Sequence, residues 1–309
     1  MVKKENKKHL TMFLFFDIII VGDIMLEVKE LFKFIDDKVI LNNINFKLDK
    51  GDILGLIGPT GSGKTVLLEI LSTLSECSQG NIYLNNKKIN KEDVGFMPST
   101  IKLYKKSKIK NLIEYNDTFY KNDTIKKALD LAKTLNLDIN VKVEDLSYPE
   151  LKKLGFILTI SHSPKIIALD EPFKGLEYKD KIKLMDLMKK EGKDGNIVII
   201  ASSSLKDPRE IARKIALIKK GVIIDIGYTH KLNIKKYYNI RIKAKNIKKV
   251  NFDLTKLKVK KLENDYIECI LFDKINNFIN QISSLEIDYL YIEEPDILEL
   301  INYFYNRKE

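Results

Sequence analysis

The stretch GPTGSGKT, at residues 58–65, matches the pattern G-x-x-x-x-G-K-[ST] at every required position. It follows an apolar run and opens an amphipathic one, the strand-to-helix context that a phosphate-binding loop needs. Backbone N–H groups of such a loop and the helix N-terminus attract phosphate groups. The lysine would reach the β- and γ-phosphates, and the threonine hydroxyl would bind Mg²⁺. The predicted nucleotide-binding residues are Gly58, Pro59, Thr60, Gly61, Ser62, Gly63, Lys64 and Thr65.

Two adjacent carboxylates supply a second element of the same chemistry. The aliphatic run IIALDEP ends in Asp170 and Glu171, and Pro172 stops the strand. Asp170 would hold Mg²⁺ with its water shell, and Glu171 would polarise the attacking water. The alternative is a strand that ends in a solvated acidic turn. The position after a phosphate loop favours a site that binds ATP and Mg²⁺.

Short aliphatic segments and longer periodic segments alternate from Leu26 onward, as in an α/β fold. The aliphatic segments are bounded by turn formers and indicate buried parallel strands at 53–58, 94–98, 166–170 and 197–202. Helical periodicity covers residues 64–74 and 179–192, and we expect the second helix to end at Gly192. Residues 26–30 and 44–53 look like antiparallel strands that flank the main sheet.

The composition changes after GVIIDIG, at residues 221–227. From about Lys235 the pattern is strand, strand, helix, strand and helix, which predicts a small α+β unit. We therefore divide the chain into a nucleotide-binding domain at 25–230 and an accessory domain at 235–309.

Residues 1–24 are a separate N-terminal extension in this reading. A basic stretch precedes an apolar run that Asp17 interrupts and that is too short to span a membrane. No clean signal-peptide cleavage site follows. Either translation starts at Met25 or the extension is dispensable, and a weak membrane-surface anchor is the alternative.

The overall charge and the cysteines carry little functional information. The formal net charge is +11, but the lysines are spread along the whole chain, so the charge alone does not point to nucleic acid. Cys77 and Cys269 lack metal-binding or redox spacing, which indicates reduced thiols that pack as small apolar groups.

The phosphate loop, the carboxylate pair and their order resemble the nucleotide-binding domain of ABC transporters, from about Leu26 to Gly227. EPFKGLE (171–177) stands at the family's D-loop, LSYPE (146–150) at its signature and IALIKKGVIIDIG (215–227) at its closing strands. IEEPDILELINYF (292–304) looks like the end of the accessory domain found on ATPases of type-2 multidrug or antibiotic exporters. The resemblance implies a P-loop NTPase of ABC type, with a mixed sheet, flanking antiparallel strands and a helical subdomain, plus a small C-terminal α+β domain.

The resemblance also implies roles and partners. Glu171 would be the catalytic carboxylate, and Thr65 and Asp170 would bind the metal. Phe34 would stack on adenine, unless it is an ordinary buried phenylalanine. Two ATP-binding subunits, as a homodimer or a heterodimer, would close around ATP at the cytoplasmic face of the membrane. The segment LYKKSKIKNLIEY (103–115) would contact a separate permease, unless it is a solvated basic helix.

Three family motifs, the Q-loop, the switch and the signature, have lost their usual side chains. Ser99 stands where the Q-loop has glutamine or an acidic residue, and Ser203 stands where the switch histidine is expected. Tyr148 and Pro149 replace the two signature glycines, and Pro149 has no N–H to donate to a phosphate. In addition, Glu177 replaces the D-loop aspartate. His162 in SHSPK does not replace the missing histidine, and we expect it to be structural or exposed.

The signature still has the pattern of a helix start. Ser147 would be the N-cap, Glu150 its capping-box partner and Pro149 a residue of the first turn. The Ser147 hydroxyl would then still face a nucleotide.

We expect firm MgATP binding with slow hydrolysis that drives export. The alternative is a hydrolysis-impaired regulatory module. An ATPase of nucleic-acid processing is disfavoured, since the chain has neither a long coiled coil nor a tandem second domain.

Overall fold

The computed structural model describes residues 25–120, 124–229, 238–253 and 255–293. The central element is a six-stranded sheet in the order β10-β9-β3-β8-β7-β6. Its strands are β3 (Ile53–Ile57), β6 (Val94–Met97), β7 (Ile166–Asp170), β8 (Ile197–Ser202), β9 (Lys214–Lys219) and β10 (Val222–Tyr228). All neighbours are parallel except β9 and β10, which are antiparallel. The four predicted parallel strands and the mixed sheet are confirmed.

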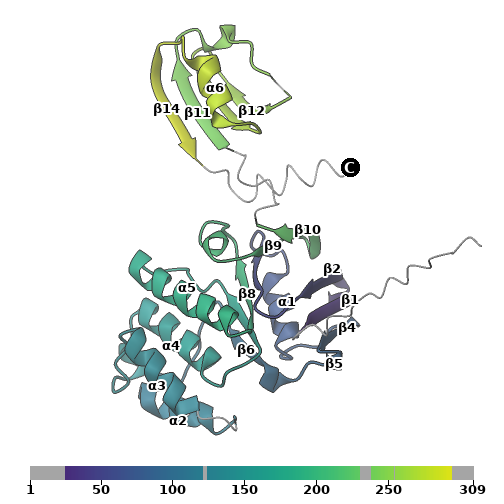
Figure 1. The fold of residues 1–309 in the computed structure, drawn as a ribbon, viewed down its shortest axis with the longest axis vertical. Coiled ribbons are helices and arrows are strands. Elements are labelled where there is room, and N and C mark those ends of the chain that lie inside the picture. The colour runs from purple at the N-terminus through teal and green to yellow at the C-terminus, as the bar shows by residue number, and fades with distance from the viewer. Residues whose placement is uncertain (1–24, 121–123, 230–237, 254, 294–309) are drawn as a thin grey trace, which may run out of the picture.

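A second, antiparallel sheet packs beside the central one in the order β2-β1-β4-β5 (Figure 1). It consists of β1 (Leu26–Ile35), β2 (Lys38–Leu48), β4 (Gln79–Leu84) and β5 (Lys87–Lys88). One hydrophobic cluster joins this sheet, helix α1 (Lys64–Leu71) and one face of the central sheet. Because helices and the second sheet cover both faces, β3, β7 and β8 are aliphatic at most positions and buried along their whole length.

Four helices lie on the other side of the central sheet. They are α2 (Ile109–Asp117), α3 (Thr124–Thr134), α4 (Tyr148–Ile160) and α5 (Tyr178–Lys193). Figure 1 shows α2, α3 and α4 grouped at the end remote from the antiparallel sheet, as expected for the helical subdomain. Short 3-10 turns occur at Lys91–Asp93, Val143–Asp145, Pro208–Glu210 and Ile247–Lys249.

The predicted end of α5 at Gly192 is wrong. Gly192 lies inside the helix, where a Cβ atom would come within 3.2 Å of Ile53. The missing side chain lets α5 pack closely against β3. The helix ends at Lys193, and Gly195 then takes a left-handed backbone with φ +96°.

A third, four-stranded sheet forms the C-terminal unit, in the order β12-β13-β11-β14. It comprises β11 (Tyr238–Ala244), β12 (Leu257–Leu262), β13 (Tyr266–Leu271) and β14 (Ile287–Glu293), with α6 (Ile275–Ile282) on one face. Its own hydrophobic cluster includes Ile240, Cys269 and Phe278. The sequence reading missed β12, because this edge strand, LKVKKL, buries only Leu257, and its short apolar alternation of Leu257 and Val259 breaks at a register shift between Val259 and Lys261.

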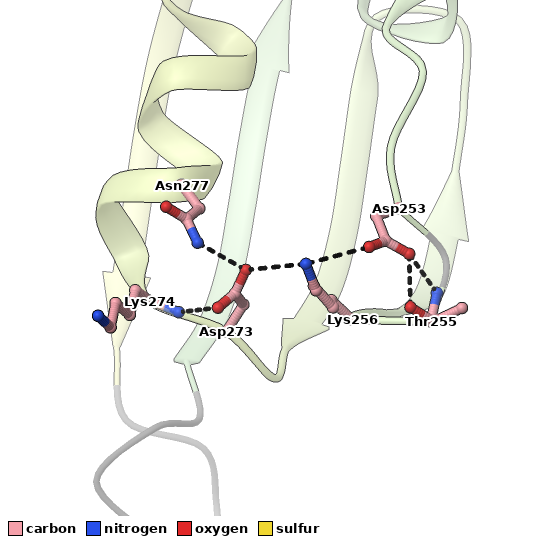
Figure 2. Close-up of polar contacts among 6 residues, drawn as sticks. All are labelled: Asp253, Thr255, Lys256, Asp273, Lys274 and Asn277. Atoms are coloured by element: carbon pink, nitrogen blue, oxygen red, sulfur yellow. Dashed lines mark hydrogen bonds and ion pairs between the residues drawn. The ribbon is translucent and has the colours of Figure 1, made fainter.

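Charged and polar side chains join the start of β12 to the start of α6 (Figure 2). Lys256 lies 3.3 Å from Asp253 and 3.7 Å from Asp273. Asp253 also accepts hydrogen bonds from the Thr255 hydroxyl and N–H, which lower its pKa. Asp273 accepts from the Asn277 amide and the Lys274 N–H, which lower its pKa too. These contacts fix the loop that precedes β12 against the N-terminus of α6.

The described residues include no helix long and apolar enough to cross a membrane. The extension 1–24, the linker at 230–237 and most of IEEPDILELINYF lie outside the described residues. The domain boundaries at 25–230 and 235–309 therefore stay a prediction. Cys77 and Cys269 are both free thiols.

Candidate functional site

The predicted phosphate loop connects β3 to α1, and two of its glycines have a clear steric reason. A Cβ atom at Gly58 would lie 2.1 Å from the carbonyl oxygen of Ile218. Gly63 has φ +101°, and a Cβ atom there would lie 2.7 Å from Leu41. Only glycine fits such a backbone at such a separation. The sequence therefore sets the loop close against β9 and β2 and leaves its backbone exposed toward the neighbouring cavity.

Lys64 brings a buried ammonium group into this loop. Its Nζ donates hydrogen bonds to the carbonyl oxygens of Gly58 at 2.7 Å and Pro59 at 2.9 Å. Burial lowers the pKa of Lys64, and the nearby Glu171 and Asp170 carboxylates oppose that shift. An anion bound in the loop would meet this cation together with the N-terminus of α1.

The predicted metal ligands, which are far apart in the sequence, are in direct contact. The Thr65 hydroxyl donates a hydrogen bond of 2.7 Å to a carboxylate oxygen of Asp170. Asp170 is the last residue of β7 and is buried. A hydroxyl and a carboxylate oxygen next to a phosphate loop are the hard oxygen ligands that Mg²⁺ prefers, so the residues fit this ion.

Glu171 follows at once, with an unusual backbone and a fixed side chain. Its φ of +47° is left-handed, which costs a residue other than glycine about 1–3 kcal/mol. Its N–H donates to Ala201 O at 2.9 Å. Its carboxylate accepts from the Ser203 N–H at 2.7 Å and from the Ser202 hydroxyl at 3.3 Å. Such strain persists where the surroundings determine the conformation from several sides.

These residues share one cavity of about 460 Å³. Its lining combines loop residues with both carboxylates, including Thr60, Gly61, Gly63, Lys64, Thr65, Asp170 and Glu171. Of the other predicted loop residues, Pro59 contributes its carbonyl to Lys64, and the buried Ser62 hydroxyl has no hydrogen-bond partner among the described residues. The sequence reading missed Lys174, which also lines the cavity three residues after Glu171.

The two unusual serines also line this cavity, and their main chains make the contacts. Ser203 reaches Glu171 through its N–H, as described above. Ser99 accepts a hydrogen bond of 2.8 Å at its carbonyl oxygen from Lys152 on α4. The positions predicted for the lost glutamine and histidine therefore lie at the site and contact it through backbone atoms.

The helix start at LSYPE is confirmed. Ser147 is the N-cap of α4, and its side chain and that of Glu150 form the predicted capping box, with Pro149 in the first turn. The Ser147 hydroxyl donates to Glu150 at 2.6 Å. Tyr148 is half-exposed, and its ring packs on Gly175, where a Cβ atom would lie 2.4 Å from the ring.

Phe34 lies on β1 with 41% of its surface exposed. Its ring stacks on that of Phe32, with centroids 6.2 Å apart. The alternative of an ordinary buried phenylalanine is therefore wrong, and adenine stacking stays a prediction.

His162 is buried and is not among the residues that line the cavity of Asp170 and Glu171. Its ring stacks on Tyr120 with centroids 3.9 Å apart. Burial, followed by the charge of Lys127, lowers its pKa from 6.5 to about 4. We expected His162 to be either structural or exposed. Its burial agrees with a structural role, and the exposed alternative is wrong.

The low pKa of His162 predicts an acid-dependent loss of stability. The unfolded chain binds a proton at this histidine below about pH 6.5, whereas the folded chain binds it only near pH 4. The stabilisation is thus complete above pH 6.5 and is lost as the pH falls toward 4. Between pH 7.5 and 5 we expect a loss of about 2 kcal/mol from this group. Urea unfolding should show that loss in the wild type, and His162→Gln should lack it. Equal pH slopes would contradict the assignment.

The sequence is similar to those of known ATP-binding proteins. The family model "ABC transporter" matches residues 41–174. The uncharacterized ABC transporter ATP-binding protein YhcH of Bacillus subtilis is 30% identical over 220 residues, covering 68% of this chain and 72% of that protein. The lantibiotic transport ATP-binding protein SrtF of Streptococcus pyogenes is 28% identical over 224 residues, covering 71% and 97%.

Solved structures agree on the fold. The dimeric structure of MJ0796, a bacterial ABC transporter cassette, matches with a TM-score of 0.61 and 24% identity, covering 66% of this chain and 98% of that one. A structure of an ATP-binding subunit of an ABC transporter matches with a TM-score of 0.62 and 19% identity, covering 66% and 90%.

Proposed function

The chain belongs to the ABC transporter ATP-binding family, and from this premise we propose that it binds MgATP and hydrolyses it slowly to drive export through a separate membrane permease. The observation that carries the proposal is the Thr65–Asp170 contact of 2.7 Å, in one cavity with Lys64 and Glu171. These residues supply a cation for the phosphates, oxygen ligands for the metal and a carboxylate for the attacking water.

Each residue has one role in this proposal. The loop N–H groups and Lys64 bind the phosphates of ATP. Thr65 and Asp170 hold Mg²⁺, which neutralises phosphate charge when it is bound. Glu171 orients a water molecule and takes up its proton. The Ser203 N–H and the Ser202 hydroxyl fix the direction of the Glu171 carboxylate.

Slow hydrolysis follows from the side chains that are missing. Neither Ser99 nor Ser203 presents an amide or an imidazole side chain to a γ-phosphate. In a closed pair of subunits, LSYPE would face the ATP held by the partner, where Pro149 has no N–H to donate. Loss of one transition-state donor lowers a rate by about 100-fold.

The permease would bind at an exposed aromatic surface formed by Tyr115 and Phe119, which are each at least 60% exposed. Tyr115 and Phe119 make an edge-to-face contact, and a cavity of about 340 Å³ beside Phe119 is lined by Leu74, Phe96 and Tyr120. Residues 103–115 are not one solvated helix, since α2 begins at Ile109 and buries Ile109 and Ile113. This surface would hold the chain, as one of a pair, at the cytoplasmic face of the membrane.

A regulatory module is the second candidate function. In it, ATP would close a pair of subunits and hydrolysis would be nearly absent. The Tyr148, Ser99 and Ser203 positions favour this candidate, whereas the fixed carboxylate of Glu171 favours hydrolysis, because a pure binder has no use for it.

Co-purification from native membranes tests the proposal. The full-length chain should bring down a protein with spanning segments, identified by mass spectrometry. Tyr115→Glu/Phe119→Glu should abolish this recovery and keep ATP binding. Leu262→Glu, on the exposed edge of β12, is the matched control and should keep both. Recovery that is insensitive to the aromatic surface, or no membrane protein at all, would contradict the proposal.

A further inference from the structure

Lys152 is among the largest fully buried side chains of the described protein, with 1% of its surface exposed. It lies in α4, one turn after Tyr148, whose ring centre is 5.9 Å from its ammonium nitrogen. A buried ammonium group is stable only where acceptors replace its lost water. Its partners therefore show what this lysine does.

Two carbonyl oxygens from two different segments accept from Lys152. Its Nζ donates to Ser99 O at 2.8 Å and to Glu171 O at 3.1 Å. Ser99 follows β6 and Glu171 follows β7, and these strands are parallel neighbours in the central sheet. One side chain of α4 thus joins the carboxyl ends of two adjacent strands, at the edge of the nucleotide cavity.

The contact with Glu171 completes the restraint on that residue. The backbone of Glu171 is left-handed, so the peptide that carries its carbonyl needs an external partner to keep its direction. Ala201 O holds the N–H, Lys152 holds the carbonyl, and Ser203 holds the carboxylate. A rotation of this backbone would turn the carboxylate away from the cavity.

We propose that Lys152 is a positioning residue for ATP hydrolysis: its ammonium group sets the backbone of Glu171 and of Ser99, and so couples the position of the signature helix α4 to the direction of the catalytic carboxylate. This inference rests on the proposed function. It adds a residue to the predicted site, because Lys152 belongs neither to the phosphate loop nor to the metal ligands and reaches Glu171 through that residue's main-chain carbonyl.

The neighbouring lysine provides a matched control. Lys153 is also largely buried, but it pairs with Asp180 on α5 at 2.8 Å. Lys153→Met removes the same ammonium group one residue away, without removing a contact to Ser99 or Glu171. Lys152→Met and Lys153→Met keep a side chain of similar length, so both full-length proteins can be compared with the wild type.

The expected result is a separation of turnover from binding. Lys152→Met should lower kcat about 10–100-fold, the scale for a slightly misplaced reacting group, and leave KM for ATP within about twofold. Lys153→Met should leave both within about twofold. In a Glu171→Gln background, Lys152→Met should add no further loss, because its effect acts through Glu171. Three results would overturn the inference: an unchanged kcat in Lys152→Met, a parallel loss of ATP binding, or a further loss of turnover when Lys152→Met is added to Glu171→Gln.

Amide hydrogen exchange separates this inference from the proposed function. In Lys152→Met, residues 99–103 and 171–177 should exchange about 10-fold faster than in the wild type or Lys153→Met. If the wild type has no turnover that depends on Glu171, the proposed hydrolysis is wrong, and exchange alone decides whether Lys152 restrains both segments. Unchanged exchange in these segments would overturn the inference in either case.

Discussion

Glu171→Gln is expected to lower ATP turnover by about 1000-fold, within the range for removal of a general base. The amide keeps the shape of the side chain and can still accept from the Ser203 N–H, but it cannot take up a proton from water. The Thr65–Asp170 contact and the bonds of Lys64 are unaffected. ATP affinity should therefore stay within about twofold, because binding and chemistry depend on different groups. Phosphate release and equilibrium binding of ATP, on the same protein preparation, measure both quantities.

The matched control for this change is Glu144→Gln, at a half-exposed carboxylate whose partner is Lys142. It removes one negative charge outside the cavity, so turnover should not change. If Glu171→Gln turns over ATP as fast as the wild type, Glu171 is not the catalytic base. If the wild type has no turnover to lose, the regulatory module is the better reading.

Much of the fold could be predicted because buried strands need aliphatic residues, which are easily recognised in a sequence. Strands buried on both faces, such as Ile166–Asp170, are aliphatic at nearly every position, and the pattern GPTGSGKT needs its glycines for steric reasons visible at Gly58 and Gly63. The edge strand β12 has no such run of aliphatic residues, because its lysines are exposed to solvent and only Leu257 is buried. The end of α5 was misplaced because Gly192 serves close packing and Gly195 serves the helix end.

The site residues could be predicted only where the side chain, rather than the main chain, makes the contact. Thr65, Asp170 and Glu171 carry their chemistry in their residue types, so the sequence indicates them directly. Ser99 and Ser203 contact the site through a carbonyl and an N–H, which every residue other than proline has. Lys152 is one of many lysines, and only the fold shows that it is buried between two strand ends.

The signature allows the second large prediction, a gain of function. Tyr148→Gly/Pro149→Gly restores an N–H at residue 149 and removes the ring that packs on Gly175. Ser147 and Glu150 still form the capping box, so the start of α4 should persist. Two glycines in the first turn lower helix stability by about 1 kcal/mol each at most, so a modest fall in Tm is expected. Turnover should rise by up to about 100-fold, the scale for one transition-state hydrogen-bond donor. Tyr148→Phe keeps the ring and adds no donor, and should leave turnover unchanged.

A mixing experiment shows whether this gain acts on the partner's ATP. We expect a triple variant, Glu171→Gln with Tyr148→Gly and Pro149→Gly, to be inactive alone, since both of its paired sites lack the general base. Mixed with wild type in a homodimer, it would place its glycine signature against the intact phosphate loop and Glu171 of the wild-type subunit. Turnover per wild-type chain should then exceed that of wild type alone. No gain in the mixture, together with a gain in the double variant alone, would mean that the signature acts within its own chain, through Lys152 and Glu171, rather than across a pair of subunits.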